Sequence, residues 1–321
     1  MEQTFLHYAK KFLIEKNKSL ANSSYMNCEN YINKILMPCF WMKNIEDINT
    51  EDIKNFINYL TKRYSNQTAK NIYSILKQIL DLAVMDGVIE TNYARLFKIE
   101  SKKENKINNS KDIVLTDFEI NRVCDYCKKS LSKGGIGVII SLKTGARKGE
   151  VISLRWDDIN LNSQNPCINI KSTVTRYRNK KGIISYQIGK TKTKFSKRSI
   201  PLNNKLKQLL EDYRQEYKIK FSLNDKELNK CFLIPNKNPT DFISPNKLDY
   251  YFRKLKKECK LNEKIKFHSL RHTFITKCTV EKNIPLSIVK YLVGHSTSTS
   301  ITVDTYTHIN QDDVNNYRDK L

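Results

Sequence analysis

The segment "KFHSLRHTF", residues 266–274, places two histidines four positions apart with an arginine between them. Positions four apart lie on one face of a helix, so His268 and His272 could hold a zinc ion together. The zinc-protease pattern puts a glutamate directly after the first histidine, but Ser269 stands there, and Arg271 would bring a cation beside the metal. Metal binding is therefore disfavoured. The segment is either part of a phosphate-binding site or a polar helix start without chemistry.

Further polar residues that could join such a site lie in the second half of the chain. Four of the five histidines lie in the last 54 residues, and Tyr306 stands among them in "VDTYTHI". Arg147 stands at a glycine-flanked turn in "TGARKGEVISLRW". Each has an ordinary explanation when taken alone: Arg147 as a surface arginine, His295 as a helix C-terminal residue favoured by the dipole, and Tyr306 as a core residue. Their function depends on whether the fold brings them together.

Residues 167–202 have apolar residues at a spacing of 2, which predicts β-structure with a hairpin near Lys181 and Gly182. Within this ribbon, residues 171–198 hold ten Lys or Arg and no Asp or Glu. A few lysines often protect a sheet edge from aggregation, but ten without one carboxylate exceed that need. We therefore expect the ribbon to lie against DNA or RNA. The residues expected to contact the nucleic acid are Lys171, Arg176, Arg178, Lys190, Lys194, Lys197 and Arg198.

The charge of the whole chain also indicates a polyanionic partner. In 321 residues, 57 Lys and Arg against 33 Asp and Glu give a net charge of +24. The excess is uneven, because residues 1–100 hold 13 basic and 11 acidic side chains whereas residues 101–321 hold 44 and 22. Such an excess repels itself unless a polyanion neutralises it. The ordinary alternative is a lysine-rich proteome with a solvated surface.

The composition disfavours several classes of protein. The sequence has no run of 18 apolar residues, which predicts no membrane span, and its N-terminus lacks the apolar core and cleavage site of a secretory signal. Of eight cysteines, Cys124 and Cys127 alone form a C-x-x-C pair, and a zinc ribbon needs a second pair. We expect reduced thiols in a cytoplasmic, nucleoid-associated protein that uses no metal or other cofactor.

Residues 1–98 show helical periodicity without a strand pattern, which predicts a small four-helix bundle. Residues 99–112 are polar and without periodicity, and we expect them to form a linker. The expected helices cover residues 4–14, residues 25–35 after serine caps at Ser23 and Ser24, a third segment from a cap at Thr50 to about Leu60, and a fourth from about Ser65 to Asp86 that stops at Gly87.

Residues 113–321 are predicted to form a second domain that is mainly helical, with the small antiparallel ribbon described above. A capping box of Thr116 and Glu119 opens its first helix. Further helices are expected over residues 136–142, ending at "TGAR", and over 148–154, 205–221, 245–259 with Pro245 in its first turn, 269–282, and from Pro285 to Gly294.

In their order along the chain, the polar motifs resemble those of the tyrosine recombinases, which include lambda-type and conjugative-element integrases and the Xer proteins. The matching motifs are "TGARKGEVISLRW" (144–156), "KTKTKFSKRSIPL" (190–202), "HSLRHTF" (268–274), "LVGHS" (292–296) and "VDTYTHI" (303–309). The resemblance covers residues 113–321, the catalytic half. The helical half resembles, less specifically, the SAM-like core-site DNA-binding domain of the family. A site-specific recombinase is implied, acting in integration or excision of a mobile element or in Xer-like resolution.

The resemblance also assigns a phosphate-binding group to individual positions. Arg147 and Arg271 match the two arginines that clamp the phosphate in the family. Glu150, three residues after the first of them, matches the acidic residue that supports it. His268 matches the first position of the family motif HxxR, and His295 the histidine that follows a glycine. His272 is expected to be structural, packing or hydrogen-bonding at the helix start.

The remaining two roles are those of an acid and a nucleophile. Tyr306 matches the nucleophile, and Tyr317 lacks the flanking pattern. Lys192 matches the catalytic lysine of the family best. Lys194 is the alternative, because the alignment through the ribbon can shift by two residues. His295 and Tyr306 are separated by 11 positions, slightly more than is usual in the family. The implied product is a 3′-phosphotyrosyl link with a free 5′-hydroxyl, formed without ATP or Mg²⁺.

The resemblance further implies double-stranded DNA as the partner and four identical protomers on two recombination sites, with accessory DNA-bending proteins as possible helpers. The 15 residues after Tyr306 would suit docking onto a neighbouring subunit. Because the chain begins almost directly with the helical bundle, we expect either a compact Xer-like architecture without a further arm-site domain or a truncated protein.

Three alternatives remain open from the sequence alone. A topoisomerase-like enzyme would use the same phosphotyrosyl chemistry to relax DNA. A DNA-binding regulator on the same scaffold would act by occupancy, although it would have no reason to keep Tyr306 and Lys192 together. A metal-dependent nuclease would lose its activity in EDTA.

Overall fold

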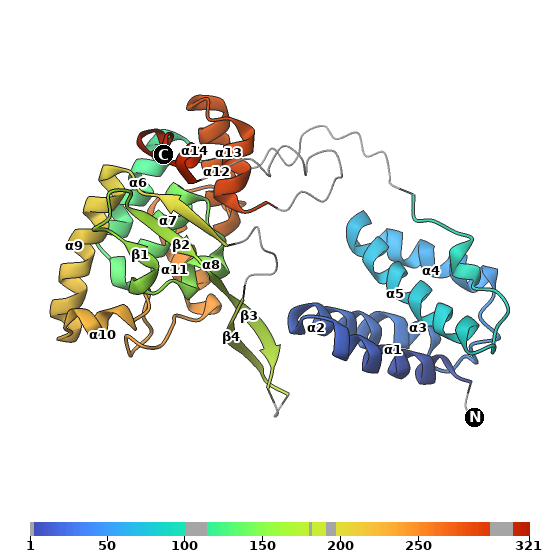
Figure 1. Cartoon of the computed structure of the whole chain (residues 1–321). Helices are drawn as coiled ribbons and strands as arrows, with labels where there is room; N and C mark the ends of the chain where they lie inside the picture. Colours follow the sequence, from blue (N-terminus) through green and yellow to red (C-terminus); the bar gives the residue numbers. More distant parts are fainter. Residues whose placement is uncertain (1–2, 101–113, 180–181, 191–196, 296–310) are drawn as a thin grey trace. The chain divides into compact units, whose positions relative to one another are not determined.

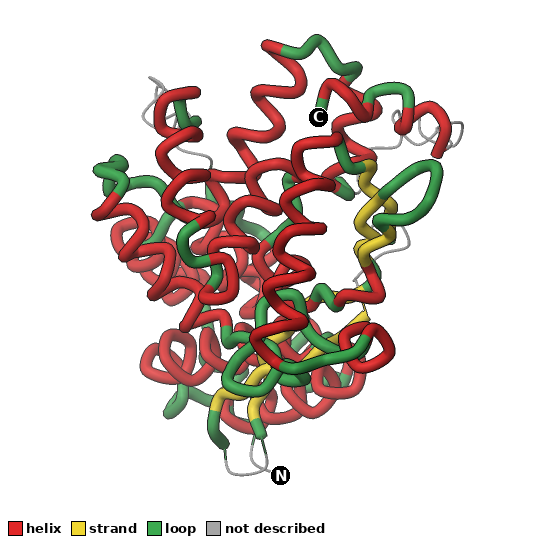
Figure 2. Tube along the Cα trace, turned by 90° about the vertical axis from the view of Figure 1, so that its left-hand side faces the viewer, coloured by secondary structure: helices red, strands yellow, loops and turns green. Residues whose placement is uncertain are grey.

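The structure is a computed structural model that describes residues 3–100, 114–179, 182–190, 197–295 and 311–321. The expected linker, 99–112, therefore lies almost wholly outside the described residues. The chain divides into two compact units, one of Met1–Asn109 with Arg176–Ser185 and one of Ser110–Thr175 with Tyr186–Leu321. Helices predominate, and the strands form small antiparallel sheets (Figure 1, Figure 2). This confirms the predicted fold class.

The first unit contains the four predicted helical regions, and the second of these is divided into consecutive segments. Its elements are α1 (Phe5–Ser19), α2 (Asn22–Tyr31), the π-helical turn η1 (Ile32–Leu36), α3 (Met37–Phe40), α4 (Thr50–Arg63), α5 (Asn66–Met85) and the 3₁₀ turn η2 (Tyr93–Arg95). They surround an apolar core that includes Phe5, Phe12, Leu36, Ile53, Leu60, Ile72, Leu76 and Ile79.

In the first unit, the helix caps predicted at Ser23, Ser24 and Thr50 are wrong. Ser23 and Ser24 lie inside α2, which begins without a side-chain cap. Thr50 is the first residue of α4, because the Asn49 side chain accepts the first backbone N–H groups of that helix. Helix α5 follows Ser65, whose side chain caps it, and ends before Gly87, which has φ +72°, so both ends agree with the predicted bounds.

The second unit contains the predicted helices together with several shorter ones. Its helical elements are α6 (Asp117–Lys128), η3 (Leu131–Lys133), α7 (Gly135–Thr144), α8 (Lys148–Ser153), η4 (Trp156–Asp158), α9 (Asn204–Phe221), α10 (Asp225–Asn229), α11 (Pro245–Glu258), α12 (Phe267–Thr276), the π-helical η6 (Lys277–Glu281), α13 (Leu286–Val293), α14 (Gln311–Asn315) and η7 (Arg318–Lys320). The predictions missed α10 and α14, since five residues are too few to show a helical period. No helix of the described ranges is both long and apolar enough to span a membrane.

Helix α7 lies at the centre of the second unit and packs against α6, α8 and α12. Its residues are almost all buried, which explains why the sequence shows an apolar run without a polar face. The helix ends at Gly145, whose φ of +67° is left-handed. A Cβ there would come within 2.6 Å of the Phe274 ring and 2.8 Å of Val293. Glycine therefore allows the sharp turn that leads directly into Arg147 and α8.

The predicted ribbon is divided between two sheets. Strands β1 (Ile159–Asn160), β2 (Cys167–Ile170) and β5 (Arg198–Pro201) form an antiparallel sheet in the order β1-β2-β5, with Ile168 opposite Ile200. Strands β3 (Ser172–Arg178) and β4 (Ile184–Lys190) form a separate hairpin at the predicted position. The division has a physical reason, because β2 and β5 bury their isoleucines in the core whereas β3 buries none of its residues fully.

The described C-terminal residues pack on their own unit. Helix α14 lies against β5 and α13, and Val314 is fully buried. At the chain end, Lys282 Nζ donates a hydrogen bond of 2.9 Å to the carbonyl oxygen of Leu321. Residues 311–321 thus pack within their own unit, and the expected docking onto a neighbouring subunit stays a prediction.

Candidate active site

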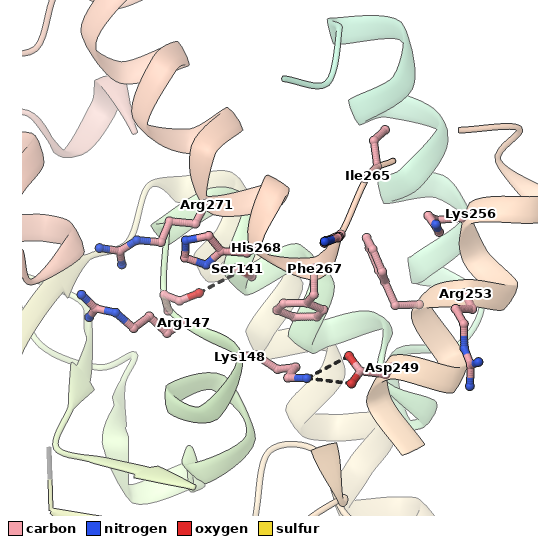
Figure 3. Close-up of a pocket in the computed structure, with 13 residues that line it drawn as sticks. Ser141, Arg147, Lys148, Asp249, Arg253, Lys256, Ile265, Phe267, His268 and Arg271 are labelled. Atoms are coloured by element: carbon pink, nitrogen blue, oxygen red, sulfur yellow. Dashed lines mark hydrogen bonds and ion pairs between the residues drawn. The ribbon is translucent and has the colours of Figure 1, made fainter. Parts of the chain in front are cut away.

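A cleft of about 470 Å³ lies in the second unit between the start of α8, α11 and the start of α12 (Figure 3). Its ionisable lining residues are Arg147, Lys148, Asp249, Arg253, Lys256, Lys266, His268 and Arg271. One carboxylate thus stands among six lysines and arginines. A cleft with this imbalance attracts anions, because a low-dielectric wall strengthens the field of the charges that line it.

Arg147 is the residue from which α8 begins, and its side chain is fixed by three groups. Its Nη1 lies 3.0 Å from Glu150 Oε1. The same guanidinium donates to two carbonyl oxygens at the end of α13, those of Val293 at 3.3 Å and Gly294 at 2.8 Å. The side chain is still 39% exposed, and it lines the cleft.

Arg271 is 1% exposed, an unusual position for a guanidinium. Its Nη1 donates to the Gly145 carbonyl oxygen at 2.7 Å. Its Nη2 is buried and has no hydrogen-bond partner among the described residues. Burial, together with repulsion from Arg147 and Arg198, lowers the pKa of Arg271 to about 9, and the charge of Glu150 opposes this shift. This cation is thus buried with less compensation than buried charges usually have.

The guanidinium groups of Arg147 and Arg271 lie next to each other, and the His268 ring lies beside Arg271 (Figure 3). The ring of His268 packs edge-on against His272, with centroids 4.7 Å apart at an angle of 87°. His272, half-buried, therefore occupies a packing position at the helix start, which agrees with the structural role expected for it.

His295 follows the left-handed Gly294 that ends α13, and it is near the same cations. Although much of the residue is exposed, partial burial of its ring lowers the pKa of His295 to about 4, together with the positive charges of Arg271, Arg147 and Lys290 and a smaller contribution from His268. The described residues thus bring Arg147, Arg271, His268 and His295 to one place, as the sequence analysis expected.

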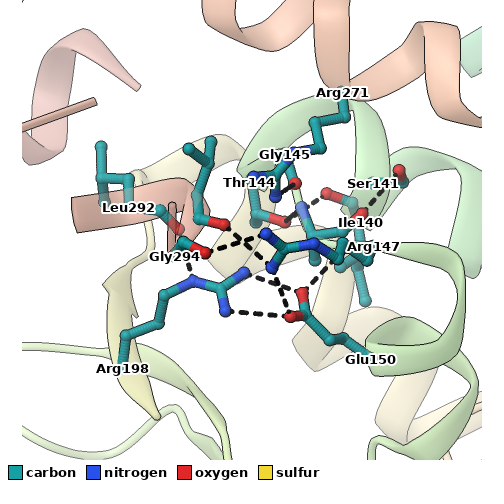
Figure 4. Close-up of polar contacts among 12 residues, drawn as sticks. Ile140, Ser141, Thr144, Gly145, Arg147, Glu150, Arg198, Arg271, Leu292 and Gly294 are labelled. Atoms are coloured by element: carbon teal, nitrogen blue, oxygen red, sulfur yellow. Dashed lines mark hydrogen bonds and ion pairs between the residues drawn. The ribbon is translucent and has the colours of Figure 1, made fainter. Parts of the chain in front are cut away.

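Glu150 is 3% exposed and supports Arg147, as predicted. Burial would raise the pKa of this carboxyl, but the hydrogen bonds and charges of Arg198 and Arg147 outweigh it and hold the pKa below its usual range. The carboxylate therefore stays ionised beneath the two guanidinium groups (Figure 4).

Arg198 does not fit the DNA contact predicted for it. Its side chain is 0% exposed, and its Nη2 lies 2.8 Å from Glu150 Oε2. Its Nε donates to the Leu292 carbonyl oxygen at 2.6 Å. The sequence placed Arg198 in a cationic ribbon on solvent, but β5 returns to the sheet core at this point, so that prediction is wrong for the described state.

The other ribbon residues have different positions. Lys171 is exposed and lies 3.0 Å from Asp158 in an ion pair. Arg176 is half-buried and Arg178 exposed on β3, and Lys197 is exposed before β5. Lys190 ends β4. The remaining predicted residues of this group and of the catalytic set, Lys192, Lys194 and Tyr306, lie outside the described residues.

Part of the cleft was not predicted from the sequence. Lys148 Nζ lies 2.7 Å from Asp249, and both line the cleft together with Arg253 and Lys256 of α11. The position of Lys148 next to Arg147 in the motif was a usable signal. For α11 no such signal exists, because its charged residues look like the solvated face of any amphipathic helix.

Within the described ranges, no group of three or more His, Cys, Asp or Glu is placed to hold a metal ion. Cys127 of the C-x-x-C pair is buried, and Cys124 is half-buried on the same helix. Burial raises the pKa of both thiols. They are therefore poor metal ligands and contribute to packing of α6, as the helical pattern predicted.

Comparison with known proteins identifies the chain. The model described as "Phage integrase family" matches residues 113–313, and the model described as "Phage integrase central domain" matches residues 5–99. The chain belongs to the phage integrase family. It is a site-specific tyrosine recombinase that binds DNA, which confirms the function predicted from the motifs.

Curated relatives agree with this assignment. The recombinase is 30% identical over 278 residues to the XerC-like tyrosine recombinase of Caldanaerobacter subterraneus subsp. tengcongensis, which covers 83% of this chain and 68% of the relative. It is 24% identical to the ICEBs1 integrase of Bacillus subtilis, over 92% of this chain and 77% of that protein.

Two solved structures share the fold. One is the Tn1549 transposon integrase in complex with a circular intermediate DNA, with a TM-score of 0.72 and 20% identity over 99% of each chain. The other is a lambda integrase tetramer bound to a Holliday junction, with a TM-score of 0.65 and 19% identity over 92% of this chain and 79% of that one.

Proposed function

We propose that the recombinase cuts one DNA strand with Tyr306 and holds the scissile phosphate between Arg147 and Arg271. His268 and His295 complete the phosphate site. Lys192, or its competitor Lys194, protonates the leaving oxygen. The biological setting is integration or excision of a mobile element, or Xer-like resolution, and the relatives named ICEBs1 integrase and XerC-like recombinase represent these two settings.

The observation that carries the proposal is the state of Arg271. A buried guanidinium whose Nη2 has no partner among the described residues is costly unless a ligand completes it. A phosphodiester is a suitable ligand, because its non-bridging oxygens accept two parallel N–H bonds from a guanidinium. Arg147, at the same end of the cleft, offers a second such group.

Phosphoryl transfer needs stabilisation of charge on the non-bridging oxygens. Preorganised donors in a partly dehydrated site contribute about 3–4 kcal/mol each to this stabilisation. Arg147 is held in place by Glu150 and by the end of α13, and Arg271 by the Gly145 carbonyl, so both can act without reorganising. This arrangement supports catalysis by positioning and charge.

The proposed step is balanced without a further reactant. Oη of Tyr306 attacks the phosphorus, the bond from phosphorus to the 5′-oxygen breaks, and the lysine transfers a proton to that oxygen. A phenol has an ordinary pKa of about 10, so its proton must be removed during attack, and His268 is the proposed base. The phosphotyrosyl ester keeps the bond energy, and the 5′-hydroxyl of another strand can therefore reverse the step.

The assembly is proposed to be a homotetramer on two paired sites of double-stranded DNA, with accessory DNA-bending proteins as possible helpers. The lambda integrase tetramer bound to a Holliday junction, which shares the fold, supports this choice. Since phosphate contacts supply most of the affinity, binding should weaken steeply as salt rises.

The experiment is formation of a covalent adduct. The protein is incubated in EDTA with a nicked duplex of its candidate site, and the adduct is scored by its resistance to boiling in detergent. Tyr306→Phe should abolish the adduct and leave DNA affinity nearly unchanged. The matched control is Tyr317→Phe, which should leave the adduct in place. An adduct that survives Tyr306→Phe, or that is lost with Tyr317→Phe, would refute the assignment of the nucleophile.

A further inference from the structure

Arg198 connects three elements of the second unit. It stands at the start of β5, directly after the segment that carries Lys192 and Lys194 in the sequence. Its Nε donates to the Leu292 carbonyl oxygen at 2.6 Å, close to the end of α13. Its Nη1 and Nη2 donate to the two carboxylate oxygens of Glu150, at 3.2 and 2.8 Å. A side chain that is 0% exposed and makes three directed bonds cannot be explained as solvated surface charge.

Glu150 is shared between two arginines (Figure 4). Its Oε1 accepts from Arg147 Nη1 at 3.0 Å and from Arg198 Nη1 at 3.2 Å. Its Oε2 accepts from the Arg147 backbone N–H and from Arg198 Nη2, both at 2.8 Å. Two positive groups and one negative group leave one positive charge uncompensated. Arg198 has 0% exposed side chain whereas Arg147 is 39% exposed, so the uncompensated charge is available at Arg147.

We propose that Arg198 is a positioning residue that neutralises and orients Glu150, so that Arg147 presents an undiminished positive charge to the DNA phosphate. Without Arg198, the Glu150 carboxylate would compete with the phosphate for Arg147. The bond to Leu292 adds a second effect, because it holds the end of α13, whose last carbonyls also fix Arg147 and which leads into His295. The inference rests on the proposed function of Arg147.

The first experiment compares adduct formation with DNA binding. Arg198→Met should slow adduct formation on the nicked duplex by about 10²-fold, as misplacement of a catalytic group by about 1 Å does. Affinity for the duplex and its dependence on salt should stay unchanged, since Arg198 touches no DNA in this arrangement. If Arg198→Met weakened DNA affinity and made it less dependent on salt, Arg198 would be a phosphate contact and the inference would be overturned.

The second experiment tests the charge directly. If Arg198 acts by neutralising Glu150, then Glu150→Gln should rescue Arg198→Met, because an amide does not compete for Arg147 as a carboxylate does. The double variant is expected to form the adduct at least about tenfold faster than Arg198→Met and within about threefold of Glu150→Gln alone. If Arg198→Met caused only structural damage, the losses of adduct rate in the two single variants would add in the double variant. Additive losses would overturn the inference.

Separate controls test whether the variants fold and whether the proposed function is correct. Arg198→Lys keeps the charge at the volume of Met and should recover most of the lost rate, whereas equal rates for Lys and Met would overturn the inference. If Arg198→Met does not fold, the double variant, which buries no unpaired charge, replaces it in the comparison with Glu150→Gln. Arg214→Met removes an arginine paired 3.0 Å from Asp225 elsewhere in this unit and should leave the rate unchanged. Absence of an adduct from the wild-type protein would refute the proposed function instead.

Discussion

The two units place their charged side chains in opposite ways. In the first unit the described ion pairs, such as Lys43 with Asp52 and Arg95 with Asp81, lie at the surface around an apolar core. In the second unit Glu150, Arg198 and Arg271 are themselves buried. Burying a charge costs several kcal/mol unless partners compensate it, and surface pairs cost little and contribute little.

This difference separates stability from function. The first unit is stabilised mainly by apolar burial, and its surface ion pairs contribute little to its stability. The second unit buries four charged residues among those described, Glu150, Asp158, Arg198 and Arg271, and Arg271 is incompletely paired. Such sites persist when function requires them, at a cost in stability.

The largest expected effect is at Arg271. Arg271→Met should slow adduct formation by about 10²–10³-fold, the loss that follows removal of one charge-stabilising donor. Stability should be unchanged or higher, because an apolar side chain replaces a buried cation that has an unpartnered nitrogen. Adduct kinetics and the thermal midpoint measure the two effects.

The control for this variant is Arg155→Met. Arg155 stacks 4.1 Å from the Phe232 ring and does not line the cleft. Its replacement should leave the adduct rate unaltered. If Arg271→Met lowered the thermal midpoint by many degrees, Arg271 would be a stabilising residue like those of the first unit, and the contrast between the units would fail.

The next effect compares two left-handed glycines, one from each unit. Gly145→Ala should cost about 2–4 kcal/mol, because the strain of a left-handed alanine adds to the overpacking of its Cβ against Phe274 and Val293. Gly87→Ala, with φ +72° and nothing within 4 Å of the new Cβ, should cost only the strain, about 1–2 kcal/mol. Calorimetry measures both. Equal costs would show that the turn before Arg147 is not tightly packed.

The sequence predicted the elements of both units well, because the apolar residues of long amphipathic helices such as α5 and α9 recur with a clear helical period. It also predicted the grouping of Arg147, Arg271 and the two histidines, through the resemblance of the motifs. It failed at Arg198, because alternation along a ribbon does not show which strand returns to the core sheet. It also failed at Thr50, since Asn49 and Thr50 are both good caps and geometry decides between them.

A smaller effect is expected on the pH dependence of stability, through the protonation of His295. Its pKa is lowered to about 4, from a usual value of about 6.5, by partial burial and by the charges of Arg271, Arg147, Lys290 and His268. Between these values the unfolded chain binds a proton that the folded protein does not, so stability falls as pH drops from about 6.5 toward 4.

His295→Asn should therefore lose less stability than the wild type between pH 7 and 5, as measured by thermal midpoints at the two values. Solvent at this exposed residue screens part of the repulsion, which keeps the difference modest. If His295→Asn leaves the dependence of stability on pH unchanged, the cationic cleft is not its source.

The smallest effect is expected at the surface of the first unit. Lys43 and Asp52 form an ion pair whose side chains are 39% and 21% exposed. Lys43→Met should change the free energy of unfolding by less than about 1 kcal/mol, because solvent screens the pair and the released carboxylate is rehydrated. Asp52 also keeps its bond to the backbone N–H of Asn49, so the capping box of α4 survives the change. Urea unfolding in low and high salt measures the change in the free energy of unfolding and its dependence on salt. A loss of several kcal/mol that is insensitive to salt would mean that this pair behaves as a buried one, and then charge burial would no longer distinguish the catalytic unit from its helical neighbour.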